Sequence, residues 1–280
     1  HITIVIDEPH LSRRSLGPAK KVLRRFVQET ATADDRIALV VVGRSASSVP
    51  STPDRGPLLQ AIERLRARAD WIMTGHGAQL TPEQAELILQ GDLSALELGT
   101  RILTEDPGQK SEMIPPGNPA GSESRVFRGR NASSDPTPVG IENDVKGLAL
   151  DVGRQAHAIL AQALSVSEAS LDAIVGAVWS VAPLPGEKVC LLVSEGFLLG
   201  RGTEQERARG YQQVIDAGTR SGVAVYAVVP SGLVSIAGDA SVVGVAGPAG
   251  LRDRVARAGV RLTIETLERM ADDTGGLLLR

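Results

Sequence analysis

Short runs of aliphatic residues recur along the chain and predict the strands of a buried sheet. The runs cover residues 2–6, 37–42, 189–193 and 223–229, and the chain ends in a further strand-like stretch, GLLLR. Each run is too short for a helix and lacks the alternation of apolar and polar positions that marks a half-exposed strand. Continuous apolar runs are typical of strands covered on both faces of a parallel sheet. We expect these strands to be adjacent, with 2–6 and 189–193 central.

Between these runs, apolar positions recur every three or four residues and predict amphipathic helices. The first helix covers 17–30, with Pro18 in its first turn, where proline is tolerated. The last helix begins at Thr263 and stops at a pair of glycines. The other expected helices are 54–69, 148–164, 167–182 and 204–221. This alternation favours an α/β fold with a doubly wound, mostly parallel, Rossmann-like sheet.

Two insertions interrupt the alternation. The first, 70–147, contains a short helix that Thr81 can cap, followed by a second helix at 93–103. Its Gly-, Pro- and Ser-rich part, 107–140, has neither helical nor strand periodicity, so we expect a mobile loop there. The second insertion, 231–260, is rich in Gly, Ala and Val and is expected to be irregular.

Composition and charge fit one globular domain over 1–280. Aromatic residues are only 2% of the chain, so aliphatic side chains must fill the core. The net charge is -3 and the cations are dispersed along the sequence, which gives no electrostatic reason to expect nucleic acid or an anionic membrane as partner. The single cysteine, Cys190, lies in an apolar run and is expected to be buried.

The sequence has no apolar run of the length that a membrane span needs, and no signal peptide. Because the chain begins and ends in strand-like runs, we expect it to be part of a longer polypeptide. The common enzyme motifs are also missing: there is no phosphate-binding loop and no HExxH zinc motif, and the SEG at 194–196 is not a nucleophile elbow. The four histidines have no metal-ligand spacing.

Seven short sequence segments, taken in their order along the chain, show a family resemblance. They are ITIVIDEPHLS, FVQETATADDRIALVVVG, STPDRGPLLQAIERL, LTPEQAELILQGDLSAL, LPGEKVCLLVSEGFLL, AGTRSGVAVYAV and LERMADDTGGLLL. Together they resemble von Willebrand factor A-like (VWA-like) domains, and more specifically the VWFA-related domain proteins of acidobacteria. The resemblance implies a VWA-type sheet with a metal-ion-dependent adhesion site at the carboxyl ends of its strands.

The resemblance also implies which residues would form that site, and the sequence departs from the family pattern. Asp7 matches the first aspartate of DxSxS, but Pro9 and Leu11 replace the two hydroxyl residues, and Ser12 comes one place late. The aspartate after the fourth strand is Glu195 here. The expected metal ligands of this degenerate site are Asp7, Glu8, Ser12, Glu195 and Thr74.

We expect Asp7 and Glu195 to lie at the carboxyl edge of the sheet, because the loops after two neighbouring strands face one crevice in a doubly wound sheet. Two carboxylates there need a positive partner. The candidates are a divalent ion, the amino end of the helix starting near Gly17, or an arginine such as Arg13 or Arg14. With two hydroxyls lost, binding of Mg²⁺ or another divalent cation is expected to be weak, about millimolar, or absent. The alternative is that Asp7 caps the first helix or pairs with an arginine and that Glu195 makes a turn hydrogen bond.

These observations predict a protein-binding or adhesion module of a secreted or cell-envelope bacterial protein, without catalytic residues. One alternative is a metal-assisted hydrolase or phosphoryl-transfer enzyme that uses Asp7, Glu8 and Glu195 around a cation. Another is a structural domain whose site is dead. The identity of the protein partner is not encoded in any motif.

Overall fold

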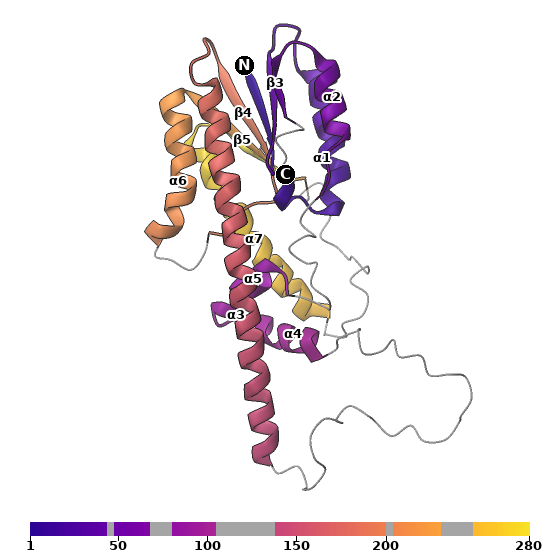
Figure 1. The fold of residues 1–280 in the computed structure, drawn as a ribbon, viewed down its shortest axis with the longest axis vertical. Helices are drawn as coiled ribbons and strands as arrows, with labels where there is room; N and C mark the ends of the chain where they lie inside the picture. The colour runs from indigo at the N-terminus through magenta and orange to yellow at the C-terminus, as the bar shows by residue number, and fades with distance from the viewer. Residues whose placement is uncertain (44–47, 68–79, 105–137, 200–203, 231–248) are drawn as a thin grey trace, which may run out of the picture.

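The computed structural model describes residues 1–43, 48–67, 80–104, 138–199, 204–230 and 249–280. Its centre is a six-stranded sheet with the order β3-β2-β1-β4-β5-β6 (Figure 1). The strands are β1 (Ile2–Ile6), β2 (Ile37–Val41), β3 (Val49–Thr52), β4 (Lys188–Val193), β5 (Val223–Val228) and β6 (Leu278–Leu279). The β3 strand runs antiparallel to β2, and the other pairs are parallel. The fold is therefore α/β with a mostly parallel sheet, compatible with a Rossmann-like fold.

The predicted strands are confirmed, including their adjacency and the central position of β1 and β4. The aliphatic runs form them because each has a neighbour on both sides and helices on both faces, so a continuous apolar sequence is buried throughout. The sequence analysis missed β3. Its residues, VPST, are partly exposed at the edge of the sheet, so they carry no apolar run.

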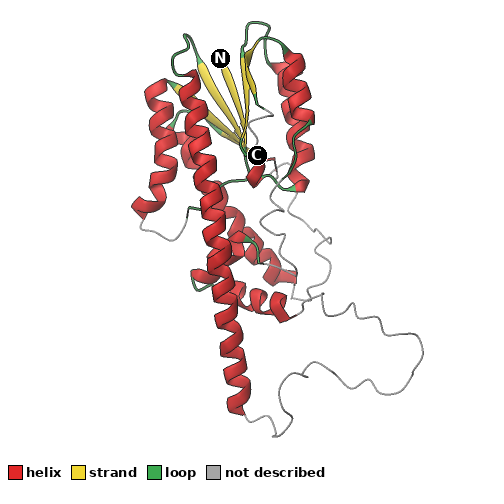
Figure 2. Ribbon diagram, viewed as in Figure 1, coloured by secondary structure: helices red, strands yellow, loops and turns green. Residues whose placement is uncertain are grey.

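Helices cover both faces of the sheet (Figure 2). They are α1 (Arg13–Arg25), α2 (Arg55–Glu63), α3 (Pro82–Leu89), α4 (Leu93–Thr104), α5 (Pro138–Val181), α6 (Glu204–Ser221) and α7 (Ala249–Asp273), with a 3₁₀ turn at Glu8–His10 and a π-helical turn at Phe26–Thr30. Helices α1 and α2 pack on one face, where Leu23, Leu58 and Ile62 meet β1 and β2. The other face is covered by α6 and the C-terminal parts of α5 and α7.

A third apolar core lies beyond the sheet. It joins α3 and α4 to the N-terminal parts of α5 and α7, and we call this unit the helical lobe. Buried Leu80, Ile88, Leu98, Val152 and Leu160 fill it. Helices α5 and α7 run from the lobe to the sheet layer (Figure 1). The α5 helix has 44 residues, so it is about 66 Å long and belongs to both cores.

The first helix begins earlier than the sequence analysis predicted. It starts at Arg13 because the Ser12 side chain accepts a hydrogen bond from the Ser15 amide and caps it. Pro18 therefore lies inside the helix, not in its first turn. The helical hydrogen bond that proline cannot donate is lost there, and burial of the neighbouring Ala19 and Leu23 outweighs that loss.

Two other helix boundaries were also predicted wrongly. The expected pair of helices at 148–164 and 167–182 is one continuous helix, α5. The stretch 165–167 between them has two serines but no helix-breaking residue. Of the second insertion, 231–260, residues 249–260 belong to α7, which begins 14 positions before Thr263. The Gly-, Ala- and Val-rich composition of 231–260 predicted irregular structure, but Gly259 allows close packing, since a Cβ there would lie 2.7 Å from Cβ of Glu83. Tertiary packing thus overrides the weak helix propensity of this glycine.

The first insertion, 70–147, contains the two short helices expected. The Thr81 side chain accepts from the Gln84 amide, and the Gln84 side chain accepts from the Thr81 amide, which makes a capping box for α3. The predicted mobile loop, 107–140, lies outside the described residues except for its last three positions, which begin α5.

Within the described residues, one stretch, Gly147–Val181 of α5, is long and apolar enough to cross a membrane by length and composition alone. A core helix of a soluble protein satisfies the same criteria. Here Leu160, Ile174 and Val178 are buried against the lobe and the sheet. The described part of the chain therefore has no clear membrane span.

We predict that Cys190 is unreactive in the native protein. The residue is fully buried in β4, and burial raises the pKa of its thiol to about 12, so the nucleophilic thiolate is absent near neutral pH. A thiol-reactive chromophore should label it only when denaturant is added. Rapid labelling of the folded chain would contradict this placement.

Candidate functional site

The candidate site lies where β1 and β4 end, side by side, at the carboxyl edge of the sheet. The backbone pairing continues one residue past each strand, because the Asp7 amide donates to the Val193 carbonyl (3.0 Å) and the Ser194 amide to the Val228 carbonyl (3.2 Å). The loops that begin at Asp7 and Ser194 therefore start from fixed backbone positions. Both face the helical lobe, which lies beyond this edge (Figure 1).

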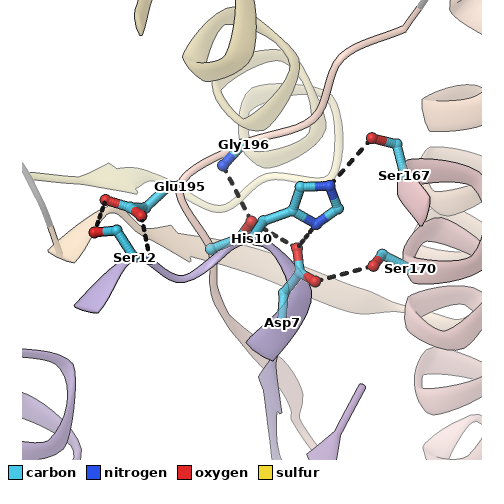
Figure 3. Close-up of polar contacts among 8 residues, drawn as sticks. Asp7, His10, Ser12, Ser167, Ser170, Glu195 and Gly196 are labelled. Atoms are coloured by element: carbon cyan, nitrogen blue, oxygen red, sulfur yellow. Dashed lines mark hydrogen bonds and ion pairs between the residues drawn. The ribbon is translucent and has the colours of Figure 1, made fainter. Parts of the chain in front are cut away.

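Asp7 is fully buried, and three side chains from three parts of the chain bind its carboxylate (Figure 3). Its Oδ1 accepts a hydrogen bond from the Ser170 hydroxyl of α5 at 2.9 Å. Its Oδ2 accepts from the Ser194 hydroxyl at 2.8 Å and lies 2.9 Å from Nδ1 of His10. These bonds compensate the loss of hydration that burial of a carboxylate entails.

His10 links Asp7 to the long helix α5. Its Nε2 lies 3.2 Å from the Ser167 hydroxyl, and its ring meets the Phe197 ring edge to face, with centroids 5.1 Å apart. Burial of the ring lowers the pKa of His10, but the nearby Asp7 carboxylate and its hydrogen bond raise it, and Glu83 and Glu195 raise it further. The net effect is a pKa above the ordinary value of 6.5. The buried carboxylate thus favours the protonated, positively charged form of His10.

Glu195 binds the amino end of α1. Its Oε2 accepts from the Ser12 amide at 2.6 Å, and its Oε1 accepts from the hydroxyls of Ser12 (3.3 Å) and Ser15. A carboxylate at this position also interacts favourably with the positive end of the helix dipole. The amino end of the helix, one of the positive partners expected, thus binds Glu195, although the helix starts at Arg13 and not near Gly17.

Glu8 turns away from this group. Its Oε1 accepts from the Arg66 amide at 2.8 Å, in the segment that follows α2. The side chain is buried, and its Oε2 makes no hydrogen bond within the described structure. Thr74, the remaining expected ligand, lies outside the described residues.

The residues that are present do not fit a Mg²⁺ site. Asp7 and Glu195 each bind their own protein donors and point to different partners (Figure 3). Hydroxyl and imidazole N–H donors occupy carboxylate lone pairs that a metal ion would need. Within the described ranges, no three His, Cys, Asp or Glu side chains are grouped so as to hold a metal ion.

The sequence analysis missed four members of this cluster: His10, Ser167, Ser170 and Ser194. The sequence contains two weak signals of this cluster. His10 follows Asp7 by three positions, and Ser167 and Ser170 have the helical i, i+3 spacing that places both on one face of α5. The alternative that paired Asp7 with an arginine expected a basic partner, and the basic side chain found at hydrogen-bond distance is His10.

Gly196 holds the second loop against α7. Its φ is +103°, and a Cβ at this position would lie 2.2 Å from the Thr263 carbonyl oxygen. Its amide donates to the Ser194 hydroxyl at 3.1 Å, which directs that hydroxyl toward Asp7. Glycine is therefore required both for the backbone conformation and for the close approach of α7.

Searches against protein-family models, curated proteins and solved structures find no match to this chain. The chemistry of the site is therefore inferred from its geometry alone.

We predict that Gly196→Ala lowers the free energy of unfolding by about 2–4 kcal/mol, because alanine is strained at this φ and its methyl group overlaps α7. Urea denaturation measures the change. The matched control is Gly176→Ala in α5, where a Cβ meets no heavy atom within 4 Å and alanine favours the helix by up to about 1 kcal/mol. Equal stability of the two variants would show that the loop is not packed as described.

We also predict a pH-dependent contribution of His10 to stability. Because its pKa in the folded protein is raised above that of the unfolded chain, the contribution is fully present below about pH 6.5 and is lost as the pH rises through the folded-state pKa. The difference in unfolding free energy between the native chain and His10→Gln should therefore be larger near pH 5.5 than near pH 8.5. A difference that grows with pH would contradict the Asp7–His10 interaction.

Proposed function

We propose that this chain is a protein-binding module of the VWA-like kind and that it works without turnover and without bound Mg²⁺. The observation that supports a mechanism without turnover and without Mg²⁺ is that protein donors already bind the carboxylates of the candidate site. The carboxylates of Asp7 and Glu195 have hydrogen-bond donors from His10, Ser170, Ser194, Ser12 and Ser15. A carboxylate whose oxygens already accept these hydrogen bonds stabilises the local fold and is not free to bind a metal ion.

The helical lobe supports the same function. It adds surface beside the carboxyl edge of the sheet, where ligands bind in open α/β folds. The edge itself is held rigid from both sides by α1 and α5, and rigid scaffolds that present variable elements are common in binding proteins. The resemblance to VWFA-related proteins supports the proposal that such a module belongs to a secreted or cell-envelope protein.

An enzymatic role has one feature in its favour. Asp7, His10 and Ser167 are connected in the order of a serine hydrolase triad. However, Ser167 is only 2% exposed and lies inside α5, so a substrate carbonyl has no direct approach to its hydroxyl. We therefore assign the chain of hydrogen bonds to stability, and a fluorophosphonate probe should leave Ser167 unlabelled in the folded protein.

We predict that metal ions change neither the chain nor its binding. Titration calorimetry with MgCl₂ should give no heat of binding tighter than about 1 mM, the range of the weakest oxygen-ligand sites. Capture of a protein partner from an extract of the encoding organism should be equal in EDTA and in Mg²⁺. Submicromolar Mg²⁺ affinity that disappears in Asp7→Ala would overturn the metal-free mechanism, and failure of the native chain to retain any protein would overturn the binding function.

A further inference from the structure

The sequence analysis described the cations as dispersed along the chain, but the outer face of α1 concentrates positive charge. Six of its 13 residues are cations, and the helix contains no acidic residue. Since the whole chain carries a net charge of -3, the rest of the chain carries -9. The cations therefore form a local positive surface on an otherwise acidic molecule. They are Arg13, Arg14, Lys20, Lys21, Arg24 and Arg25.

These six side chains share one face of the helix. At 100° per residue they fall within an arc of about 140°, opposite the buried Ser15, Ala19 and Leu23. Arg24 and Arg25 are 53% and 77% exposed. Two further exposed arginines, Arg64 and Arg66, follow α2, which packs beside α1. We call the six cations of α1 together with these two the basic face.

Local stability explains only a part of this arrangement. Arg24 and Arg25 lie in the last turn, where cations favour the helix dipole, but Arg13 and Arg14 occupy the first turn, where cations oppose it. Lys20 with Arg24 and Lys21 with Arg25 are like-charged pairs at i, i+4 spacing, which repel one another. Among the interactions of the described residues, Arg24 pairs with Glu63 (3.2 Å) and Arg25 pairs with Glu29 (2.9 Å). Features that weaken a helix locally are expected at functional surfaces.

We infer that the basic face is the docking surface for an acidic, Asp- and Glu-rich segment of a protein partner. This inference rests on the proposed protein-binding function and names the chemistry of the partner. A short acidic segment can follow the length of one helix and pair with its cations while it avoids the acidic remainder of the chain. The face also begins at Arg13, next to the site edge that Glu195 and Ser12 form.

Other polyanions fit this face less well. None of the large apolar side chains exposed in the described ranges belongs to α1, so the face has no group to insert into a bilayer. It likewise offers no exposed aromatic ring on which nucleic-acid bases could stack. An extended polyanion would, in addition, meet the negative charge of the other surfaces.

The test compares two triple variants with the same change in charge. Lys21→Gln, Arg24→Gln and Arg25→Gln neutralise the centre of the basic face, whereas Arg154→Gln, Arg220→Gln and Arg261→Gln neutralise exposed cations on α5, α6 and α7. Circular dichroism checks that both remain folded. The probe is a fluorescent oligo-glutamate peptide of about ten residues, followed by anisotropy at low salt.

We expect the basic-face variant to bind the peptide at least about tenfold more weakly than the native chain and the control variant to stay within about twofold. Native binding should fall as NaCl rises from about 50 to about 200 mM. Equal losses in both variants would mean unspecific attraction and would overturn the inference. Stronger binding to vesicles with about 30% phosphatidylserine, or to duplex DNA, than to the peptide would overturn it too.

The outcome separates this inference from the proposed function. If the basic-face variant still captures the partner as well as the native chain, the docking surface lies elsewhere and the binding function stands. If the native chain captures no protein partner, the proposed function itself fails, whatever the peptide does.

Discussion

The burial of one carboxylate, that of Asp7, constrains the arrangement around the sheet edge. An unpaired buried charge costs several kcal/mol, so a central strand that ends in aspartate requires donors from the surrounding elements. Ser194 provides one from the neighbouring strand, His10 a second from the next turn, and Ser170 a third from α5. Their positions fix the 3₁₀ turn, the loop after β4 and the height of α5 along the sheet.

The same requirement ties the two halves of the molecule together. Helix α5 gives Ser167 and Ser170 to the site, while its N-terminal part fills the core of the helical lobe. Helix α7 does the same, since Thr263 contacts the loop at Gly196 and Val255 lies in the lobe core. The lobe is thus packed on the site edge through two continuous helices.

Charged groups at the buried sheet edge and on the surface of α1 have different surroundings. At the sheet edge each carboxylate, of Asp7 and of Glu195, has several donors at hydrogen-bond distance. Along α1 most of the cations are instead exposed, so solvent screens their mutual repulsion and a partner can still reach them. Glu195 lies at the junction of the two regions, because it binds the amino end of the helix that carries the basic face.

The sequence by itself determined the α/β class, the four long strands and their adjacency, because aliphatic runs of this length are stable only when covered on both sides. It also determined that Asp7 and Glu195 follow neighbouring strands, as well as the two short helices after Thr81. Only the tertiary structure decided how these carboxylates are used. Two of the three donors to Asp7 stand 163 and 187 positions away, and such pairings leave no local periodicity to read. For the same reason the early start of α7 and the continuity of α5 were decided by packing in the lobe, where burial outweighs the weak helix propensity of Gly259.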